Sequence, residues 1–360
     1  MRTEFTAFSV MVIFLLVGCG EQDVKEPLHT LKTGKIGLWI SPKQGDMKYY
    51  DEALEIAREA QIQIAHLYVQ WGLVEKSSGK YDWEIPDYIL GKFKKNGFEA
   101  VVVIPLIFTT KLDVMPEDVT FKGFSDPEFM ERFVNFTEIL IDRYKDVVKY
   151  LVVGNEIDIY LSQHPDQASD FSTLVRAVAD AHDIPVGTEC AIHSVIEYRS
   201  HDIAKKALAG DMVFYTYYPM GETFSFGQDL SNVEHAFTEM FALAGGKKIA
   251  VVETSWSSSR MLESSEETQA EYVRAIFEIL QTHKDEIEFL MWITLHDSTP
   301  EECRKSAEFF VTGVSDETLE NEAVMARFSE FMCFLGLRRT DGTPKPAWYV
   351  WMEEIDAYYR

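Results

Sequence analysis

Positive charge is scarce in this 360-residue sequence: 34 Lys and Arg residues stand against 59 Asp and Glu residues, which gives a formal net charge of −25. A chain this acidic repels nucleic acid and anionic membrane surfaces, so we expect no nucleic-acid partner. An acidic polysaccharide is a poor substrate for the same reason, unless a local basic patch serves it. Hydrophobic residues make up 46% and charged residues 26%. These proportions exclude wholesale disorder and a fibrous repeat.

Long hydrophobic runs are also missing. The apolar run at residues 5–17 follows Arg2 and is too short to span a bilayer. It ends in Leu-Val-Gly-Cys and so resembles a bacterial lipoprotein signal, which is cleaved before a Cys that carries the lipid; an ordinary signal peptide with a chance Cys is the alternative. The resemblance implies a signal peptide over 1–18 and a polar tether over 19–34 that begins with lipidated Cys19. It also implies a place in the cell envelope, on the periplasmic or outer-membrane face.

Cysteines number only four. If Cys19 is lipidated, Cys190, Cys303 and Cys333 remain, which allows one disulfide and a spare thiol, or none. The simpler interpretation is that they are buried small hydrophobic residues. None of their spacings resembles a metal site, and we expect neither metal nor cofactor.

What the sequence does contain is a regular alternation. Eight short apolar runs are separated by amphipathic stretches of helical spacing, which predicts βα units and a parallel sheet. The runs are 36–40, 62–69, 100–107, 147–153, 184–188, 212–217, 249–252 and 289–294. Helix signals lie between them: N-terminal caps at Asp126-Pro127, Ser231–Glu234 and Ser264–Glu267, and C-terminal stops at Gly97 and Gly245.

Eight such units without a linker predict one (β/α)8 barrel over residues 35–360. The alternative is a doubly wound open sheet, which normally has a Gly-rich phosphate turn after its first strand. The sequence there is Trp39-Ile-Ser-Pro-Lys43, so a nucleotide site has no support. In a barrel, functional residues lie at the carboxyl ends of the strands.

Two carboxyl groups follow strands at that end. Glu156 comes directly after the fourth run and Glu253 directly after the seventh. The fourth and seventh strands lie nearly opposite one another in a barrel, so both side chains can point into one cleft. Cleavage of a glycosidic bond requires two such groups of different pKa, one to protonate the leaving oxygen and one to attack the anomeric carbon or activate water. The simpler alternative for each Glu is a helix cap or an ion pair with Lys.

Gly154-Asn155-Glu156 and Glu253-Thr254-Ser255-Trp256 resemble the signature of clan A of the glycoside hydrolases, which includes endo-β-1,4-galactanases, β-mannanases, cellulases and β-1,3-glucanases. The resemblance covers the whole barrel. It implies a retaining hydrolase in which Glu156 is the acid/base and Glu253 the nucleophile. It further implies that Asn155 binds the sugar 2-hydroxyl, that Tyr217 holds the nucleophile (Tyr215 standing where the clan often has His), and that Trp292 floors the subsite of the cleaved sugar.

One departure from the clan pattern stands on the second strand. Many members carry an Arg five positions before a Trp, where it contacts the nucleophile; here Trp71 is present but His66 replaces the Arg. A neutral His holds a carboxylate less firmly than a fixed cation. Either His66 substitutes, or another cation reaches in, or the protein is a weakened relative.

Aromatic residues at strand ends predict sugar-binding platforms. The candidates are Trp39, Trp71, Trp256 and Trp292, with Trp83 equally well explained by loop packing, and His296 and Asp297 as further subsite candidates. A row of platforms predicts an endo-acting enzyme on a β-linked oligo- or polysaccharide. The rival hypothesis is a non-catalytic carbohydrate-binding surface lipoprotein with the same barrel. A metal-dependent hydrolase is disfavoured because no His-x-His follows the first strand.

Overall fold

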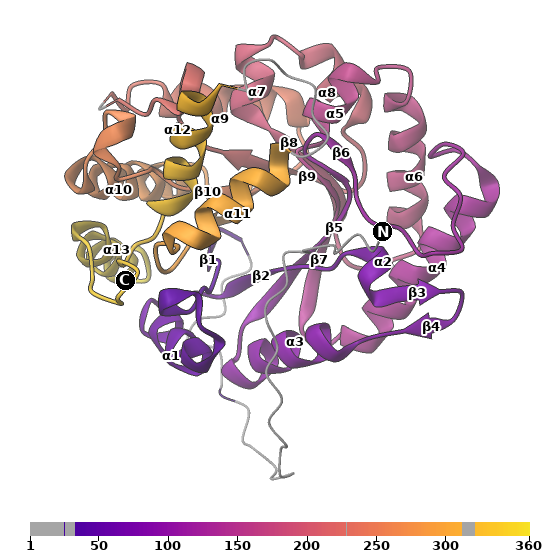
Figure 1. Ribbon diagram of the computed structural model, residues 1–360, viewed down its shortest axis with the longest axis horizontal. Coiled ribbons are helices and arrows are strands. Elements are labelled where there is room, and N and C mark those ends of the chain that lie inside the picture. The colour runs from indigo at the N-terminus through magenta and orange to yellow at the C-terminus, as the bar shows by residue number, and fades with distance from the viewer. Residues whose placement is uncertain (1–24, 26–32, 228, 312–320) are drawn as a thin grey trace.

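The computed structural model describes residues 25, 33–227, 229–311 and 321–360, and its centre is a closed parallel barrel. Eight strands form it in sequence order, and pairing of β1 with both β2 and β11 and of β2 with β5 closes the ring (Figure 1). The fold is therefore the (β/α)8 barrel that the sequence predicts. The strands are β1 (Lys35–Leu38), β2 (Ile64–Tyr68), β5 (Glu99–Phe108), β7 (Val148–Asn155), β8 (Val186–Ala191), β9 (Met212–Tyr217), β10 (Ile249–Thr254) and β11 (Ile287–Trp292).

Helices surround the barrel, and the chain ends with three more after the last strand. Between strands lie α1 (Tyr50–Glu59), α2 (Trp71–Val74), α3 (Glu84–Asn96), α4 (Pro127–Tyr144), α5 (Ile157–Gln163), α6 (Ala168–Asp180), α7 (Ile192–Glu197), α8 (His201–Ala207), α9 (Val233–Ala244) and α10 (Glu266–Thr282). After β11 come α11 (Pro300–Val311), α12 (Glu322–Cys333) and α13 (Pro346–Tyr358). Short elements complete the chain: β3 (Glu75–Ser77), β4 (Lys80–Tyr81), β6 (Lys111–Leu112), η1 (Lys43–Gly45), η2 (Met47–Tyr49), η3 (Glu222–Phe224) and η4 (Arg260–Leu262).

The helix boundaries confirm three of the five predicted signals. Asp126 caps α4 by accepting a hydrogen bond from the Phe129 amide, and Pro127 is the first helical residue. Gly97 and Gly245 end α3 and α9 in the left-handed conformation. The two capping boxes are wrong in detail. Helix α9 begins after Asn232, without a side-chain cap, and α10 is capped by Ser265, whose hydroxyl accepts from the Thr268 amide.

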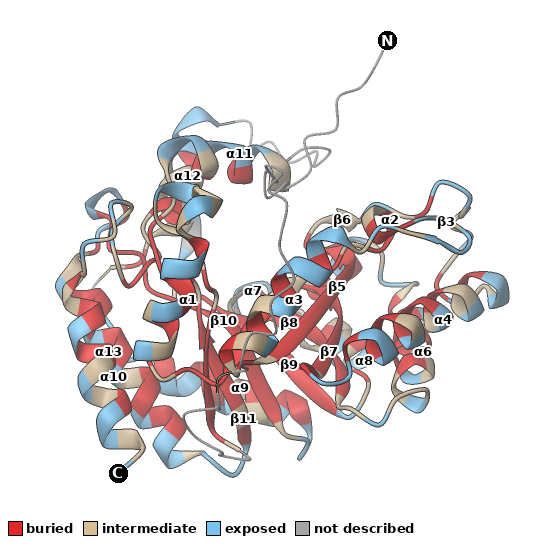
Figure 2. Ribbon diagram, turned by 90° about the horizontal axis from the view of Figure 1, so that it is seen from below, coloured by how far each residue is buried: buried red, intermediate tan, exposed pale blue. Residues whose placement is uncertain are grey.

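Alternate residues along β2, β5, β7, β9, β10 and β11 fill the barrel interior. One buried cluster contains Ile64, Val101, Val103, Tyr150, Val152, Met212, Phe214, Ala250, Val252, Phe289 and Met291, which share one face of the sheet. The residues between them face the helices and form the larger outer core, so the strands are buried on both faces (Figure 2). Because successive side chains alternate, this parity decides which residues at the strand ends look into the barrel mouth.

An ion pair lies at the amino end of the barrel. At the amino end, buried Lys35 donates to Glu99 at 2.6 Å and to the Tyr150 hydroxyl at 3.0 Å, so a cation offsets the carboxylate there.

A disulfide joins Cys303 of α11 to Cys333 of α12, and Cys190 is a buried free thiol. Cys19 and the predicted signal peptide lie outside the described residues. Within the described part of the chain, no helix is long and apolar enough to cross a membrane.

Candidate active site

The end of β7 aims Glu156 into the barrel mouth. Gly154 precedes it with φ of 84°, and a side chain there would collide with Ile157 and Phe171, so glycine is required at this turn. Glu156 itself adopts φ of 47°, a strained conformation for a residue with a side chain. Its two carboxyl oxygens accept hydrogen bonds from Thr216 at 2.8 Å and Thr109 at 3.0 Å. Local strain and two hydroxyl donors thus fix the direction of this carboxyl group.

Glu253 reaches the same mouth from β10. The register of β10 shifts between Val251 and Glu253 against β9, so the inward alternation is broken and Glu253 follows inward-facing Val252 into the mouth. Its carboxyl oxygens accept hydrogen bonds from two phenols, Tyr68 at 2.9 Å and Tyr218 at 2.7 Å. The group is almost fully buried, with 7% of its surface exposed.

A third carboxyl group, Glu189 of β8, lies beneath the other two. It is completely buried, and its Oε1 accepts from the Asn155 amide at 2.6 Å, whereas Oε2 has no partner among the described residues. The Thr109 hydroxyl lies 3.0 Å from both Asn155 Oδ1 and Glu156 Oε2, which share its single hydrogen, and Thr109 is held at φ of 55°. Glu189 is therefore linked to the candidate acid/base through Asn155 and Thr109.

The carboxyl groups shift one another's proton affinity. Burial raises the pKa of Glu253 to about 7; the charge of Glu156 also raises it, and the hydrogen bonds from Tyr218 and Tyr68 lower it. Burial raises the pKa of Glu156, and its two threonine partners oppose the rise. Burial, followed by the charges of Glu253 and Glu156, raises the pKa of Glu189 well above its usual range. At neutral pH the three groups therefore share protons.

His66 does not supply the missing cation. Its ring stacks on Trp39 with centroids 4.6 Å apart, and burial lowers its pKa to about 3, so it is neutral. Neither ring nitrogen has a hydrogen-bond partner among the described residues. Among the described residues that line the cleft, Lys76 is the one Lys or Arg. Glu253 is held by the phenols of Tyr68 and Tyr218.

Glu156 and Glu253 line one cleft of about 1160 Å³, together with their partners Tyr68, Thr109 and Tyr218. Of the residues predicted from sequence, it brings together Glu156, Glu253, Asn155, His66 and Trp39. Three of the tryptophans predicted as sugar-binding platforms lie outside the cleft, so the prediction is wrong for them. The buried indoles of Trp71, Trp256 and Trp292 donate to Glu75, Ser264 and the Leu335 carbonyl, and none of them lines the cleft. On β11, Phe289 and Met291 face inward, so Trp292 faces the helices.

The prediction that Tyr217 contacts the nucleophile is also wrong, by one position in the sequence. The ring of Tyr217 packs against Phe237 of α9, outside the barrel, and Tyr218 is the phenol that contacts Glu253. Tyr215 also faces outward, donating to the Met240 carbonyl. The sequence analysis missed five residues of the site: Tyr68, Thr109, Glu189, Thr216 and Tyr218. Four of these could have been found from strand alternation. Tyr68, Glu189 and Thr216 occupy inward-facing positions of their strands, and Tyr218 continues the inward alternation of β9.

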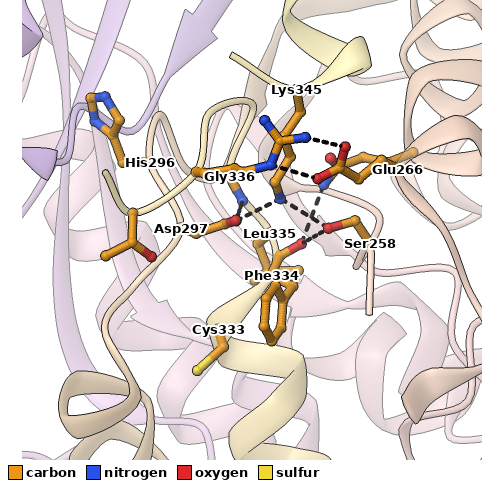
Figure 3. Close-up of polar contacts among 12 residues, drawn as sticks. Ser258, Glu266, His296, Asp297, Cys333, Phe334, Leu335, Gly336 and Lys345 are labelled. Carbon is orange, nitrogen blue, oxygen red and sulfur yellow. Dashed lines mark hydrogen bonds and ion pairs between the residues drawn. The ribbon is translucent and has the colours of Figure 1, made fainter. Parts of the chain in front are cut away.

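His296 and Asp297 are not subsite residues. Asp297 is buried and accepts from Lys345 at 2.7 Å and from the Gly336 amide at 2.9 Å, as Figure 3 shows. Lys345 also donates to Ser258 at 2.9 Å. His296 contacts the Ser41 carbonyl through Nδ1 at 2.8 Å. These contacts attach the segment between α12 and α13 to the top of the barrel, behind the wall of the cleft.

The sequence matches no protein-family model and no curated protein. Solved structures with the same fold are nevertheless numerous. A variant of a GH5_18 protein from Bifidobacterium longum subsp. longum, solved with Manβ1-4GlcNAc, aligns with a TM-score of 0.67 at 15% identity over 90% of this chain and 78% of that one. Xylanase 10B from Thermotoga maritima aligns with a TM-score of 0.58 at 14% identity over 91% of this chain and 96% of that one.

An exo-β-1,4-mannosidase from Opitutaceae bacterium strain TAV5 aligns with a TM-score of 0.63 at 14% identity. The alignment covers 95% of this chain but 62% of the mannosidase. At these identities the similarity establishes the architecture alone: the chain has the (β/α)8 fold of these structures.

Proposed function

We propose that this chain is a retaining glycoside hydrolase for neutral β-linked sugars, with Glu156 as the acid/base and Glu253 as the nucleophile. The observation that carries the proposal is the convergence of two carboxyl groups in one cleft, half-buried Glu156 from β7 and buried Glu253 from β10, each held by two hydroxyl groups. The donors support the division of roles. Phenols are more acidic than threonine hydroxyls, so they stabilise a neighbouring carboxylate better. The two phenols therefore favour the ionised form of Glu253 and oppose the rise that burial gives its pKa.

The reaction then has two steps. Glu156 gives its proton to the glycosidic oxygen while a Glu253 oxygen attacks the anomeric carbon, so the bond to the leaving sugar breaks and a glycosyl ester forms. Glu156, now ionised, takes a proton from water, whose oxygen attacks the anomeric carbon and displaces Glu253. Asn155 uses one amide hydrogen on Glu189, which leaves the second for the sugar 2-hydroxyl.

The charge of the cleft supports a neutral sugar. Acidic side chains outnumber its single Lys: Asp82, Glu84, Glu156, Asp158, Glu197 and Glu253 line it. A uronic acid would meet repulsion there. Since two of the structural neighbours are described with a β-mannoside ligand or mannosidase activity, β-mannosides are the first substrates to test.

The rival function is sugar binding without catalysis, favoured by one observation: Glu253 has neutral phenols and not a cation as partners. Hydrolysis of a panel of β-mannan, β-galactan, xylan and glucans by the full-length chain separates the two. Glu156→Gln and Glu253→Gln should each lower turnover by at least about 10³-fold while binding persists. Glu267→Gln, on the exposed side of α10, is the matched control and should leave turnover unchanged. Binding without turnover in the wild type would establish the rival.

We also propose that Cys19 carries a lipid and holds the barrel at the cell envelope, as the motif at residues 16–19 indicates. Metabolic labelling with a fatty acid tests this. Label should enter the wild-type chain and be absent from Cys19→Ser, whereas equal labelling of both would contradict the anchor.

A further inference from the structure

A helical hairpin roofs the barrel mouth. Helix α11 leaves the β11 side of the barrel and α12 returns to it, and Figure 1 shows α11 lying across the opening toward β6 and β8. At the base, the disulfide Cys303–Cys333 joins the two helices, and the Ser298 amide donates to the Cys333 carbonyl at 3.2 Å. In Figure 2, α11 and α12 lie at the top of the view, and the strands of the barrel lie below them. The base of the hairpin is therefore fixed to one wall of the mouth.

The far end of α11 is attached to the opposite wall. Lys111 of β6 donates to the Phe309 carbonyl at 2.9 Å, and Thr110 donates to the Phe310 carbonyl at 3.4 Å. Phe108, the last residue of β5, packs on Phe309 and Phe310 with ring centroids 5.3 and 5.5 Å apart. Phe108 directly precedes Thr109, the partner of Glu156. The roof thus spans the mouth from β10–β11 to β5–β6 and meets the far wall beside the acid/base.

The cleft continues under this roof. Its lining includes Phe310 of α11 and Val324, Phe328, Phe331 and Met332 of α12. Phe331 packs edge-on against Tyr218, the partner of Glu253, with centroids 5.1 Å apart. The cleft also reaches Ile85 at α3 on one side and Tyr198 beyond α7 on the other, both exposed side chains. Access to the carboxyl groups is therefore from the sides, beneath the hairpin.

We propose that the site accepts a short β-linked oligosaccharide or the end of a chain, and not an internal segment of a polysaccharide. An internal segment has to enter a cleft from above, because both of its ends are far away, and the hairpin occupies that direction. A chain end passes beneath it. The sequence-based expectation of endo-action relied on a row of tryptophans, three of which lie outside the cleft. The proposal rests on the proposed hydrolase function and specifies its substrate.

Products and viscosity test the proposal. The full-length chain is given β-1,4-mannohexaose and soluble β-mannan, alongside the corresponding cello-, xylo- and galacto-series. The expected products are mono- or disaccharides from the outset, with no early fall in polymer viscosity. A fall in viscosity that precedes the release of small sugars would overturn the proposal.

Variants at the tip of the roof test its cause. Lys111→Ala combined with Phe310→Ala removes one hydrogen bond, the contact of the Lys111 ammonium with the Phe309 ring and the three ring contacts of Phe310. It should raise the rate of viscosity loss relative to small-sugar release by about 10-fold or more. Lys305→Ala, on the exposed side of α11 where Lys305 pairs with Glu301, is the matched control and should not change that ratio. An unchanged ratio in the tip variant would show that the hairpin does not select chain ends, and so would overturn the proposal.

Binding separates this proposal from the hydrolase proposal. If nothing in the panel is hydrolysed, the hydrolase function fails, and titration of Glu253→Gln with the same sugars then decides the substrate class. Two results together support entry by chain ends. One protein should bind per polymer chain, and the affinity should not increase further once the ligand is longer than a short oligosaccharide. Several proteins bound along one chain, or no binding to any sugar, contradicts it.

Discussion

At the scale of single residues, two phenols hold Glu253. The hydroxyls of Tyr68 on β2 and of Tyr218 directly after β9 donate to it, and His66, whose ring packs against Tyr68, is neutral. A neutral donor stabilises a carboxylate less than a cation does, so burial prevails and the pKa of Glu253 is raised to about 7. Activity that needs Glu253 ionised should therefore rise with pH through about 7.

Removing one phenol should move this pH limb upward. In Tyr218→Phe the carboxylate loses a hydrogen bond that lowers its pKa, so a higher pH is needed to ionise it, and kcat/KM at pH 7 should fall about 10-fold, equivalent to about 1.4 kcal/mol. Tyr217→Phe, the neighbouring phenol that packs on Phe237, is the control. Profiles of kcat/KM against pH give both results, and an unshifted limb in Tyr218→Phe would contradict the assignment.

Glu189 should act as a neutral hydrogen-bond acceptor that positions Asn155. Glu189→Gln keeps an acceptor for the Asn155 amide and should retain kcat/KM within about 3-fold with the same pH profile, whereas Glu189→Leu removes the hydrogen bond and should lose at least about 10-fold. Steady-state kinetics measured across pH distinguish a neutral Glu189 from an ionised one. A shift of the acid limb to lower pH in Glu189→Gln would mean that Glu189 is ionised and was raising the pKa of Glu253.

At the scale of elements, a buried ion pair fixes the segment that follows α12. Asp297 and Lys345 are 2.7 Å apart, and their side chains are 4% and 1% exposed. Burial nevertheless raises the pKa of Asp297 to about 6, above its unfolded value, with the attraction of Lys345 opposing the rise. Ionised Asp297 therefore costs folded-state stability, and the cost is lost as pH falls below the folded pKa.

Lys345→Met should make that cost visible. It leaves a buried carboxylate without its cation, so the free energy of unfolding should fall by about 3 kcal/mol at pH 8 and by clearly less at pH 5, where Asp297 is protonated. Adding Asp297→Asn to the same chain should recover most of the loss. Urea unfolding at the two pH values measures this, and an equal loss at both would contradict the proposed role of the ion pair.

The strands were predictable from sequence to a greater extent than their ends. Runs such as residues 100–107 are β-branched and buried on both faces, so they can be placed without a structure. Whether Tyr217 or Tyr218 faces the cleft depends on strand parity at the last residue, and Glu253 faces it only because the register of β10 shifts. The tryptophans were assigned from proximity to strand ends, which does not tell one face from the other. The position of α11 and α12 over the barrel mouth could not be predicted from the strand motifs, because those motifs say nothing about the helices that follow β11.

At the scale of the whole molecule, the cysteines of the described residues form one disulfide and leave one free thiol. Cys303 and Cys333 close a loop across the base of the roof, and burial raises the pKa of Cys190 well above its usual range, which keeps that thiol unreactive. This arrangement matches one of the two possibilities that the cysteine count allowed.

Peptide mapping without reductant should recover Cys303 and Cys333 as one linked pair. Cys190 should be alkylated only after denaturation, because the native thiol is buried and protonated. Alkylation of Cys190 in the native protein, or a linked pair that includes it, would contradict the packing of Cys190 in the outer core between β8 and the helices.

The anomeric configuration of the first product tests the central claim, that two carboxyl groups on β7 and β10 cleave by double displacement. Proton NMR of the reaction with whichever β-glycoside is hydrolysed, recorded before mutarotation, reads it directly. Two displacements at the anomeric carbon return the original configuration, so the account predicts that the β-anomer forms first. Initial formation of the α-anomer would mean single displacement by water and would contradict the role of Glu253 as nucleophile.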